Sequence, residues 1–316
     1  MPVAALQSTA RTSTDRTGTA LPVGALINST PGKLLRGGEF FSPVQRRLRT
    51  SDVLLSELRQ HCSRTVPRHE HELSYFTLVL HGDYLEGDRG HLDELPPFTA
   101  VFNPAGATHS TVIGPAGAVM FTIELREEAL REFGITLPRC TIFDHGAGAM
   151  LWPGLRLYSA FKAATVAPPT SEENLPEAHV LEGHVLEMLV AIARVDAPDS
   201  TAPEKPAPRW FERVKERLHE GFREPLRMRD LAREAGVHPV HLARVFRRME
   251  RRTPGEYQQR LQVRAACVLL RNPEWPLAAT AAECGFADQS HFTRVFRKMA
   301  GTTPARFRHD CSALRA

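Results

Sequence analysis

Sixteen residues of this chain occur twice in nearly the same form, fifty positions apart. LARVFRRMERRTPGEY begins at Leu242, and FTRVFRKMAGTTPARF begins at Phe292. Each copy follows a shorter matching stretch, LAREAG at 231–236 and TAAECG at 280–285. Small alanines, a turn glycine and a second periodic segment are typical of two helices joined by a tight turn. The repeat therefore predicts two tandem helix-turn-helix units, at about 226–250 and 277–299.

The second helix of each unit has an apolar face and a basic face. In the first unit, helical spacing predicts a buried face of Leu242, Val245, Phe246 and Met249. The opposite face carries His241, Arg244, Arg247 and Arg248 in the first unit, and His291, Arg294, Arg297 and Lys298 in the second. A fragment of an α-solenoid is the alternative, but such arrays need about three repeats or more to bury a core.

Charge divides the chain into two parts. From Lys205 onward, 23 Lys and Arg residues stand against 12 Asp and Glu residues, a net charge of +11, whereas residues 1–204 carry −7. All but three of these 23 basic residues are Arg, which suits bidentate contact with phosphate and guanine. The basic part fits a polyanionic partner, and an ordinary solvated surface is the alternative.

Residues about 210–310 resemble the DNA-binding domain of the AraC/XylS transcriptional regulators. The most specific match is AAECGFADQSHFTRVFRKMAGTTPARFR at 281–308. The resemblance implies seven helices, with a long helix near GEYQQRLQVRAACVLL holding the two units at a fixed spacing. It also implies that both recognition helices enter the major groove on one face of the duplex. One subunit would then read two DNA segments about one helical turn apart.

Helix geometry divides the exposed side chains of these helices into two groups. Those near the start of a recognition helix reach base edges, where Gln pairs with adenine and Arg with guanine. The base-contact candidates are Val240, His241, Arg244, Gln289, Ser290, His291 and Arg294. Later side chains are expected to meet phosphates, which position the protein without specifying sequence. The phosphate-contact candidates are Arg247, Arg248, Arg251, Arg252, Arg297 and Lys298.

The first half of the chain has a different pattern. Between about Leu34 and Leu125, LSYFTLVLHGDYLEG and FTAVFNPAGATHSTV carry β-branched and aromatic runs broken by turn residues. Short strands at this spacing predict a small antiparallel barrel or sandwich. Helical periodicity follows, notably at 150–165 and 177–195. The apolar faces of these two helices could cover the barrel or pair with a second subunit, and the sequence favours neither.

Three histidines mark the strand region. His69 and His71 form an H-x-H pair, and PAGATH ends in His109. Alternate residues of a strand point to the same side, so both imidazoles of the pair can face one interior. The order of H-x-H, apolar strand, glycine and P-x-G-x-x-H resembles the two cupin motifs. It implies a divalent metal such as zinc, iron or nickel on three histidines, and histidines that serve as pocket walls or buried hydrogen-bonding groups without metal are the alternative.

The glutamate that completes the cupin metal site is missing, and Tyr75 and Phe76 stand in its place. Whether or not it binds a metal, the interior of a small barrel that carries a few polar groups is suited to be a ligand pocket. The pocket-lining candidates are Tyr75, Phe76, His81 and Phe102, and each could equally be a core residue. A metal-dependent cupin enzyme, a dioxygenase or isomerase fused to a DNA-binding domain, is the alternative function. The missing glutamate and the AraC-type domain argue against it.

These features together predict an α+β protein that is a sequence-specific transcriptional regulator and not an enzyme. The expected parts are a disordered leader at 1–33, a cupin-like ligand-sensing and dimerisation domain at 34–196, a Pro-rich linker at 197–208 and the DNA-binding domain at 209–310. The expected partners are double-stranded promoter DNA, a small-molecule effector, a second copy of the chain and, if the protein is an activator, RNA polymerase. Five cysteines without a C-x-x-C pair, and the lack of a transmembrane-length apolar run or signal-peptide core, predict a cytoplasmic protein without a membrane partner.

Overall fold

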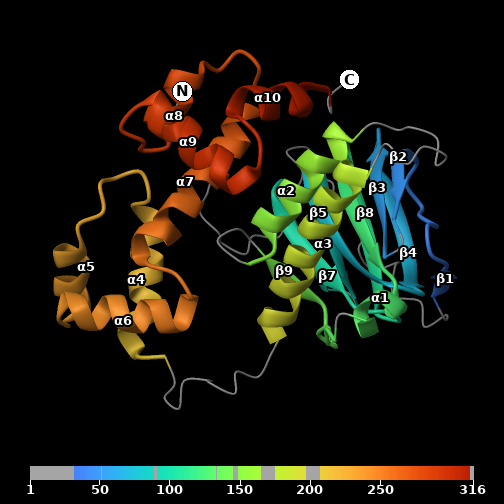
Figure 1. The fold of residues 1–316 in the computed structure, drawn as a ribbon, viewed down its shortest axis with the longest axis horizontal. Helices are drawn as coiled ribbons and strands as arrows, with labels where there is room; N and C mark the ends of the chain where they lie inside the picture. The colour runs from blue at the N-terminus through green and yellow to red at the C-terminus, as the bar shows by residue number, and fades with distance from the viewer. Residues whose placement is uncertain are drawn as a thin grey trace, which may run out of the picture.

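The structure is a computed structural model, and it describes residues 32–50, 52–88, 91–132, 134–144, 149–164, 175–196 and 207–313. Nearly all of the leader predicted at 1–33 and of the linker predicted at 197–208 lies outside these residues. The described part places strands first and helices afterwards, so the predicted α+β class is confirmed (Figure 1). No helix among the described residues is both long and apolar enough to cross a membrane.

One sheet of nine strands forms the N-terminal part of the fold. Its strands are β1 (Lys33–Leu35), β2 (Val44–Arg49), β3 (Val53–Gln60), β4 (Arg64–His71), β5 (Ser74–Asp88), β6 (His91–Glu94), β7 (Thr99–Asn103), β8 (Thr108–Leu125) and β9 (Ile142–Asp144). The main path runs β1-β4-β8-β5-β7-β9, while β3 also pairs with β8, β2 with β3 and β6 with β5. Among the strand pairs of the described residues, only the short pair of β1 and β4 is parallel.

The two longest strands curve this sheet. The first half of β8 pairs with β4 and its second half with β3, while β5 follows β8 along most of its length. The β5–β8 register shifts between Val79 and His81 and again between Gly82 and Tyr84. Irregularities of this kind bend and twist a strand pair. One face of the sheet thereby turns inward around a small interior, and the other turns outward toward the helices.

Helices cover the outer face of the sheet and make up the C-terminal part. Those that follow or interrupt the sheet are α1 (Glu127–Glu132), α2 (Leu151–Ala163) and α3 (Leu175–Asp196). The C-terminal helices are α4 (Arg209–Glu220), α5 (Met228–Ala235), α6 (Pro239–Glu250), α7 (Pro254–Leu270), α8 (Leu277–Glu283), α9 (Gln289–Ala300) and α10 (Pro304–Ala313). The seven helices α4–α10 within residues 207–313 are the number that the family resemblance implies. In Figure 1, α2 and α3 lie across the sheet, and α8–α10 lie closer to them than α4–α6 do.

Alternation along the strands separates two apolar clusters. The smaller cluster lies on the inner face and contains residues such as Val79, Ile113 and Met120. The larger cluster joins the outer face of the sheet to α2 and α3, with Phe121 and Trp152 among its fully buried members. This larger cluster continues without interruption into the cores of the C-terminal helices. The two parts of the chain therefore share one packed interior.

Candidate functional site

Helix α6 carries the first exposed basic surface. It begins after His238, whose side chain accepts a hydrogen bond from the Val240 amide at 3.3 Å, and Pro239 occupies its first turn. Three of the four apolar positions predicted from the repeat are buried: Leu242, Val245 and Phe246 are at most 4% exposed, whereas Met249 is half-buried. The base-contact candidates of this unit, Val240, His241 and Arg244, are all exposed.

Helix α9 carries the matching surface of the second unit. Its N-cap is Asp288, whose carboxylate accepts the His291 amide hydrogen at 2.7 Å. Gln289, Ser290 and Arg294 are exposed. His291 is half-buried, and its ring lies edge-on to that of Phe286 at 5.5 Å. The structure thus exposes three of the four base-contact candidates of this unit and partly covers the fourth.

The outer side of α9 borders a surface hollow of about 720 Å³. Its lining residues are Gln289, Ser290, Thr293, Arg294, Arg297, Lys298 and Thr303. The sequence does not predict Thr293 or Thr303 as part of this surface. A signal for Thr303 exists, because the Thr-Pro pair occurs in both copies of the repeat. Hydroxyl groups next to arginines suit phosphate oxygens, since both groups donate hydrogen bonds to them.

The phosphate-contact candidates are exposed with one exception. Arg247, Arg248, Arg251, Arg297 and Lys298 are exposed on or just after the two recognition helices. Arg252 is half-buried, and burial lowers the pKa of its guanidinium despite the opposing charges of Glu250 and Asp144.

Arg252 is therefore the one phosphate-contact candidate whose side chain is partly withdrawn from the exposed basic face. The cause lies one residue earlier, because Arg251 ends α6 with a left-handed φ of 57°. The chain leaves the helix at that point, so Arg252 no longer follows the basic face.

Helix α7 connects the two units, and it is anchored to both. A capping box of Thr253 and Glu256 fixes its start. The side-chain amides of Gln258 and Gln262 both donate to the Phe222 carbonyl, at 2.9 and 3.0 Å. Gln262 also donates to the Gly285 carbonyl in the turn of the second unit, at 3.3 Å. Two buried glutamines therefore tie α7 to the segment between α4 and α5 and to the turn of the second unit, a role that the sequence alone does not predict.

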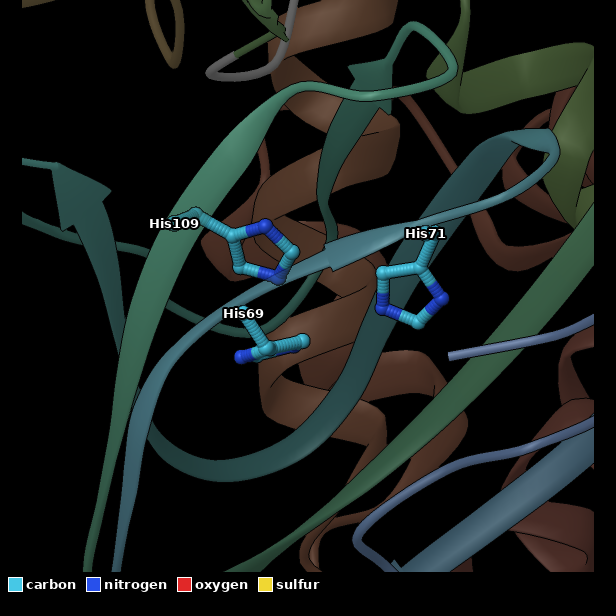
Figure 2. A group of neighbouring side chains, drawn as sticks. All are labelled: His69, His71 and His109. Carbon is cyan, nitrogen blue, oxygen red and sulfur yellow. The ribbon is translucent and has the colours of Figure 1, made fainter. Parts of the chain in front are cut away.

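The three predicted histidines meet inside the curved sheet (Figure 2). His69 and His71 come from β4 and His109 from β8, and all three are buried. One ring nitrogen of each lies within 4.8 Å of those of the other two. Burial lowers the pKa of His69 to about 4 and that of His71 to about 3, and the charge of His109 adds to both effects. Both imidazoles are therefore neutral at pH 7, which is the form that binds metal.

A tyrosine joins this histidine cluster. The Tyr75 hydroxyl lies 3.0 Å from Nε2 of His109 and accepts a hydrogen bond from the Asn103 amide at 2.9 Å. Asn103 also donates to the buried carboxylate of Glu86 at 2.7 Å. Burial raises the pKa of Tyr75 well above its ordinary value, so the free side chain is a neutral phenol. The sequence analysis misses Glu86 and Asn103, because neither belongs to the histidine motifs.

The cavity around the cluster is small and capped by aromatic rings. Its volume is about 50 Å³. Phe41 lies edge-on to His69 with ring centroids 5.0 Å apart, and Phe40 lies 6.0 Å from the His71 ring. Both phenylalanines belong to the loop between β1 and β2, whose Gly38 amide donates to the Glu124 carboxylate at 2.9 Å. Burial raises the pKa of that carboxyl to about 7.

Only one of the four predicted pocket residues lines this cavity. Tyr75 does so, whereas Phe76 and Phe102 belong to the outer apolar cluster that packs against α2 and α3. Neighbouring strand residues point to opposite faces, so a pocket that includes Tyr75 excludes Phe76. His81 is half-buried beside a register shift of β5 and is not part of the cavity wall. The predictions for Phe76, Phe102 and His81 are therefore wrong.

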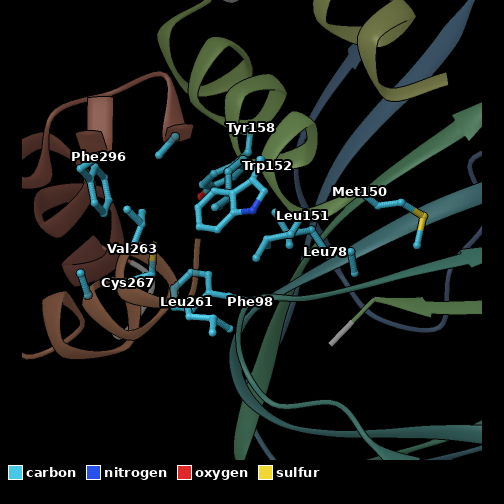
Figure 3. Packing of buried hydrophobic residues seen from close by; sticks show 14 of the residues in the cluster. Leu78, Phe98, Met150, Leu151, Trp152, Tyr158, Leu261, Val263, Cys267 and Phe296 are labelled. Atoms are coloured by element: carbon cyan, nitrogen blue, oxygen red, sulfur yellow. The ribbon is translucent and has the colours of Figure 1, made fainter. Parts of the chain in front are cut away.

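The second unit packs directly against helix α2 (Figure 3). Figure 3 shows Trp152 of α2 facing the C-terminal helices, with Phe98 and Leu261 close by. The Phe98 ring lies 5.6 Å from that of Phe307. Arg156 of α2 pairs with Glu187 and donates a hydrogen bond to the Met299 carbonyl near the end of α9, at 2.8 Å. The sheet domain therefore holds the C-terminal end of α9 and leaves its N-terminal end exposed.

Comparison with known proteins gives matches to the C-terminal helices and a structural alignment that extends over most of the chain. A family model described as a helix-turn-helix domain matches residues 231–310. The regulatory protein SoxS of Salmonella typhimurium is 34% identical over 92 residues, which cover 29% of this chain and 86% of SoxS. The HTH-type transcriptional activator RhaR of Mannheimia succiniciproducens is 25% identical over 139 residues, 44% of this chain and 50% of RhaR. The structure of ToxT from Vibrio cholerae aligns with 82% of this chain at 10% identity and a TM-score of 0.33.

Proposed function

The chain belongs to the AraC/XylS family of DNA-binding transcriptional regulators, and we propose that α6 and α9 are its two recognition helices. The observation that carries this proposal is the pair of exposed basic helix faces held on one connecting helix. Helix α7 contacts α6 through the rings of Tyr257 and Phe246, 5.5 Å apart, and contacts the second turn through Gln262, which supports a fixed separation of the two faces. A rigid pair of this kind can occupy two neighbouring segments of major groove without a second subunit.

The roles of individual side chains follow from their place on each helix. The N-terminal side chains reach base edges, and the proposed base readers are Val240, His241, Arg244, Gln289, Ser290, His291 and Arg294. The proposed phosphate contacts are Arg247, Arg248, Arg251, Arg297 and Lys298, with Thr293 and Thr303 added from the hollow beside α9. Phosphate contacts give most of the affinity and its salt dependence, whereas base contacts give the sequence preference.

We further propose that the sheet domain senses a small effector and that α2 passes the signal to α9. The shared apolar core and the hydrogen bond between Arg156 and Met299 support this route. The proposed partners are also promoter DNA in the cytoplasm, a second copy of the chain and, for an activator, RNA polymerase. SoxS and RhaR are named as a regulatory protein and a transcriptional activator, which supports a regulatory role over the alternative of a cupin enzyme.

Selection from a random DNA library tests the proposal on the full-length chain. We expect enrichment of two short sequence segments whose centres lie about 10 base pairs apart. Binding to the enriched sequence should survive moderate salt and excess competitor DNA, because base contacts add to the electrostatic term. Binding to the selected sequence that is no tighter than binding to random polymer would refute the proposed function.

A further inference from the structure

The cavity beside the three histidines is too small for the organic effector that a sensor pocket suggests. Pockets for such molecules have volumes of roughly 300–1,000 Å³, whereas this one measures about 50 Å³. A volume of that size holds a single ion with very few waters. The rings of Phe40 and Phe41 close one side of it. The interior of the sheet is therefore matched to an ion and not to a sugar or an aromatic compound.

The polar groups around the cavity form a donor set for a metal. The Nδ1–H of His69 donates to the Pro67 carbonyl at 2.9 Å, so its Nε2 keeps a free lone pair. A backbone carbonyl in this role is the usual orienting partner of a metal-binding histidine. The buried Nδ1 atoms of His71 and His109 have no hydrogen-bond partner within the described residues. Buried nitrogens without a partner are costly in an empty core. A structural hydrogen-bonding role therefore does not explain His71, and the contact of His109 with the Tyr75 hydroxyl still leaves its Nδ1 without a partner among the described residues.

Tyr75 occupies the place of a fourth donor. Its hydroxyl oxygen lies 3.0 Å from Nε2 of His109, and its ring centroid lies 4.4 Å from that of His71. Donor atoms bound tetrahedrally to one ion are about 3.3 Å apart, given metal–nitrogen bonds of about 2.0 Å. The Tyr75 oxygen already stands at nearly that distance from one histidine nitrogen. The ring nitrogens of the three histidines lie within 4.8 Å of one another, and small side-chain rotations would bring them to the same spacing.

The surrounding polar groups suit a cation at this position. The buried Glu86 carboxyl group accepts hydrogen bonds from two uncharged groups, the Tyr84 hydroxyl at 2.6 Å and the Asn103 amide at 2.7 Å. The Asn103 amide also donates to the Tyr75 oxygen, which is the hydrogen bond that a phenolate would accept.

We propose that Tyr75 completes a metal site with His69, His71 and His109, and that the bound metal ion is the effector of this regulator. Three imidazoles and one phenolate oxygen suit iron or zinc better than calcium or magnesium. The charge of the ion would favour the phenolate form of Tyr75, and the phenol proton would be released to solvent when the metal binds. The effector part of this inference rests on the proposed function, whereas the metal site stands without it.

A chain of hydrogen bonds leads from Tyr75 to the second helix-turn-helix unit. Asn103 accepts a hydrogen bond from the Thr141 hydroxyl at 2.7 Å, directly before β9. At the end of β9, the Asp144 carboxylate accepts the amide hydrogens of Met150 and Leu151 at the start of α2, at 2.8 and 3.2 Å. Helix α2 in turn holds the end of α9. A change at the Tyr75 oxygen therefore has a continuous route to a recognition helix.

The metal site is tested by loading the untagged full-length chain with iron or with zinc and measuring the bound metal by elemental analysis. We expect one ion per chain, and after oxidation of the iron a visible phenolate-to-iron charge-transfer band. Tyr75→Phe should keep the fold, lose the band and bind iron at least about tenfold more weakly. Thr77→Val is the control, because Thr77 lines the same cavity while its hydroxyl pairs with Thr122, and it should leave band and affinity unchanged. His109→Gln should weaken binding further.

The results that would overturn the proposal are distinct from those that would overturn the proposed function. A metal content near zero under conditions that do not strip metal overturns the site, and a band that survives in Tyr75→Phe overturns the fourth ligand. The affinity of apo and metal-loaded protein for the selected DNA should differ by about tenfold. Equal affinities overturn the role of the metal as effector. Failure of both forms to select any DNA sequence would instead refute the proposed function and leave the metal site standing.

Discussion

The two helix-turn-helix units have matching sequences, but their turns lie in different surroundings. Gly236 and Gly285 occupy equivalent positions and both have a left-handed φ, of 67° and 79°. A Cβ atom on Gly236 would meet nothing within 4 Å, whereas one on Gly285 would lie 2.2 Å from the Arg223 carbonyl oxygen. The second turn is thus packed against the segment that follows α4, and the first has free space. The first turn requires glycine only because of its left-handed backbone conformation. The second turn requires glycine for that reason and because no room is left for a side chain.

The ends of the recognition helices differ in a similar way. Helix α9 begins at an Asp288 cap with a 2.7 Å hydrogen bond and ends at Gly301, whereas α6 begins at His238 with a 3.3 Å bond and ends at Arg251. Helix α9 also rests on α2 through the Arg156–Met299 contact. The second unit is therefore the more firmly held of the two. Substitutions at matched positions should therefore have unequal effects.

The largest expected difference concerns the two turn glycines. Gly285→Ala should destabilise the protein by more than about 3 kcal/mol, because the left-handed conformation alone costs roughly 1–2 kcal/mol and the clash with Arg223 adds to it. Gly236→Ala should cost only about 1–2 kcal/mol. Urea unfolding followed by far-ultraviolet circular dichroism measures both. Equal losses in the two variants would show that the turns are equally constrained.

The next comparison concerns the arginines proposed to read bases. Arg244→Ala and Arg294→Ala should each weaken DNA binding by about 1–3 kcal/mol and relax sequence choice in a different segment of the site. The loss should be greater for Arg294, because Gln289 and Ser290 share its surface, whereas the apolar Val240 stands beside Arg244. Footprinting on the selected sequence and on variants of each segment gives the result. Undiminished discrimination by the double variant would remove both residues from the set of base readers.

The repeat in the sequence carries enough information to place both recognition helices and their buried faces. Helical periodicity fixes which side of a helix is apolar, so Leu242 and Phe292 are correctly placed in the core. When both faces of a strand are apolar, sequence periodicity does not show which side chains point toward the cavity. Tyr75 and Phe76 are both buried, and only the fold shows that the first faces the cavity and the second faces α2.

The remaining features depend on contacts between distant segments. Nothing local distinguishes Gln258 and Gln262 from solvent-exposed glutamines, because their partners lie in the connection between α4 and α5 and in the turn of the second unit. Arg252 looks like its neighbour Arg251 until the chain leaves the helix between them. The sequence predicts that the three histidines lie together, because two of them share one strand and the third belongs to a recognisable turn. Glu86 and Asn103, which complete their surroundings, come from other strands and carry no motif.

A smaller difference is expected at the N-caps. Asp288→Ala should destabilise the protein by about 1 kcal/mol, since it removes a charged cap at the start of α9. His238→Ala should cost only a few tenths of a kcal/mol, because the imidazole makes a longer bond and Pro239 already fixes the first turn. Thermal unfolding without DNA separates these effects from DNA binding. If His238→Ala destabilised the protein as much as Asp288→Ala does, the two N-caps would contribute equally to stability.

The smallest expected effect is a gain in stability at the end of α6. Arg251 adopts a left-handed φ of 57°, where the matched position of α9 has Gly301 at 74°. Arg251→Gly should stabilise the protein by roughly 0.5 kcal/mol, because the relief of the left-handed strain exceeds the added chain entropy. Arg251→Asn is the matched control, since asparagine tolerates this conformation and also lacks the charge. Both variants should weaken DNA binding equally across sequences and reduce the salt slope by about one unit, as measured by titrations at several salt concentrations. A loss of stability on Arg251→Gly would mean that the arginine side chain contributes more than its backbone strain costs, and the first unit would then be held as firmly as the second.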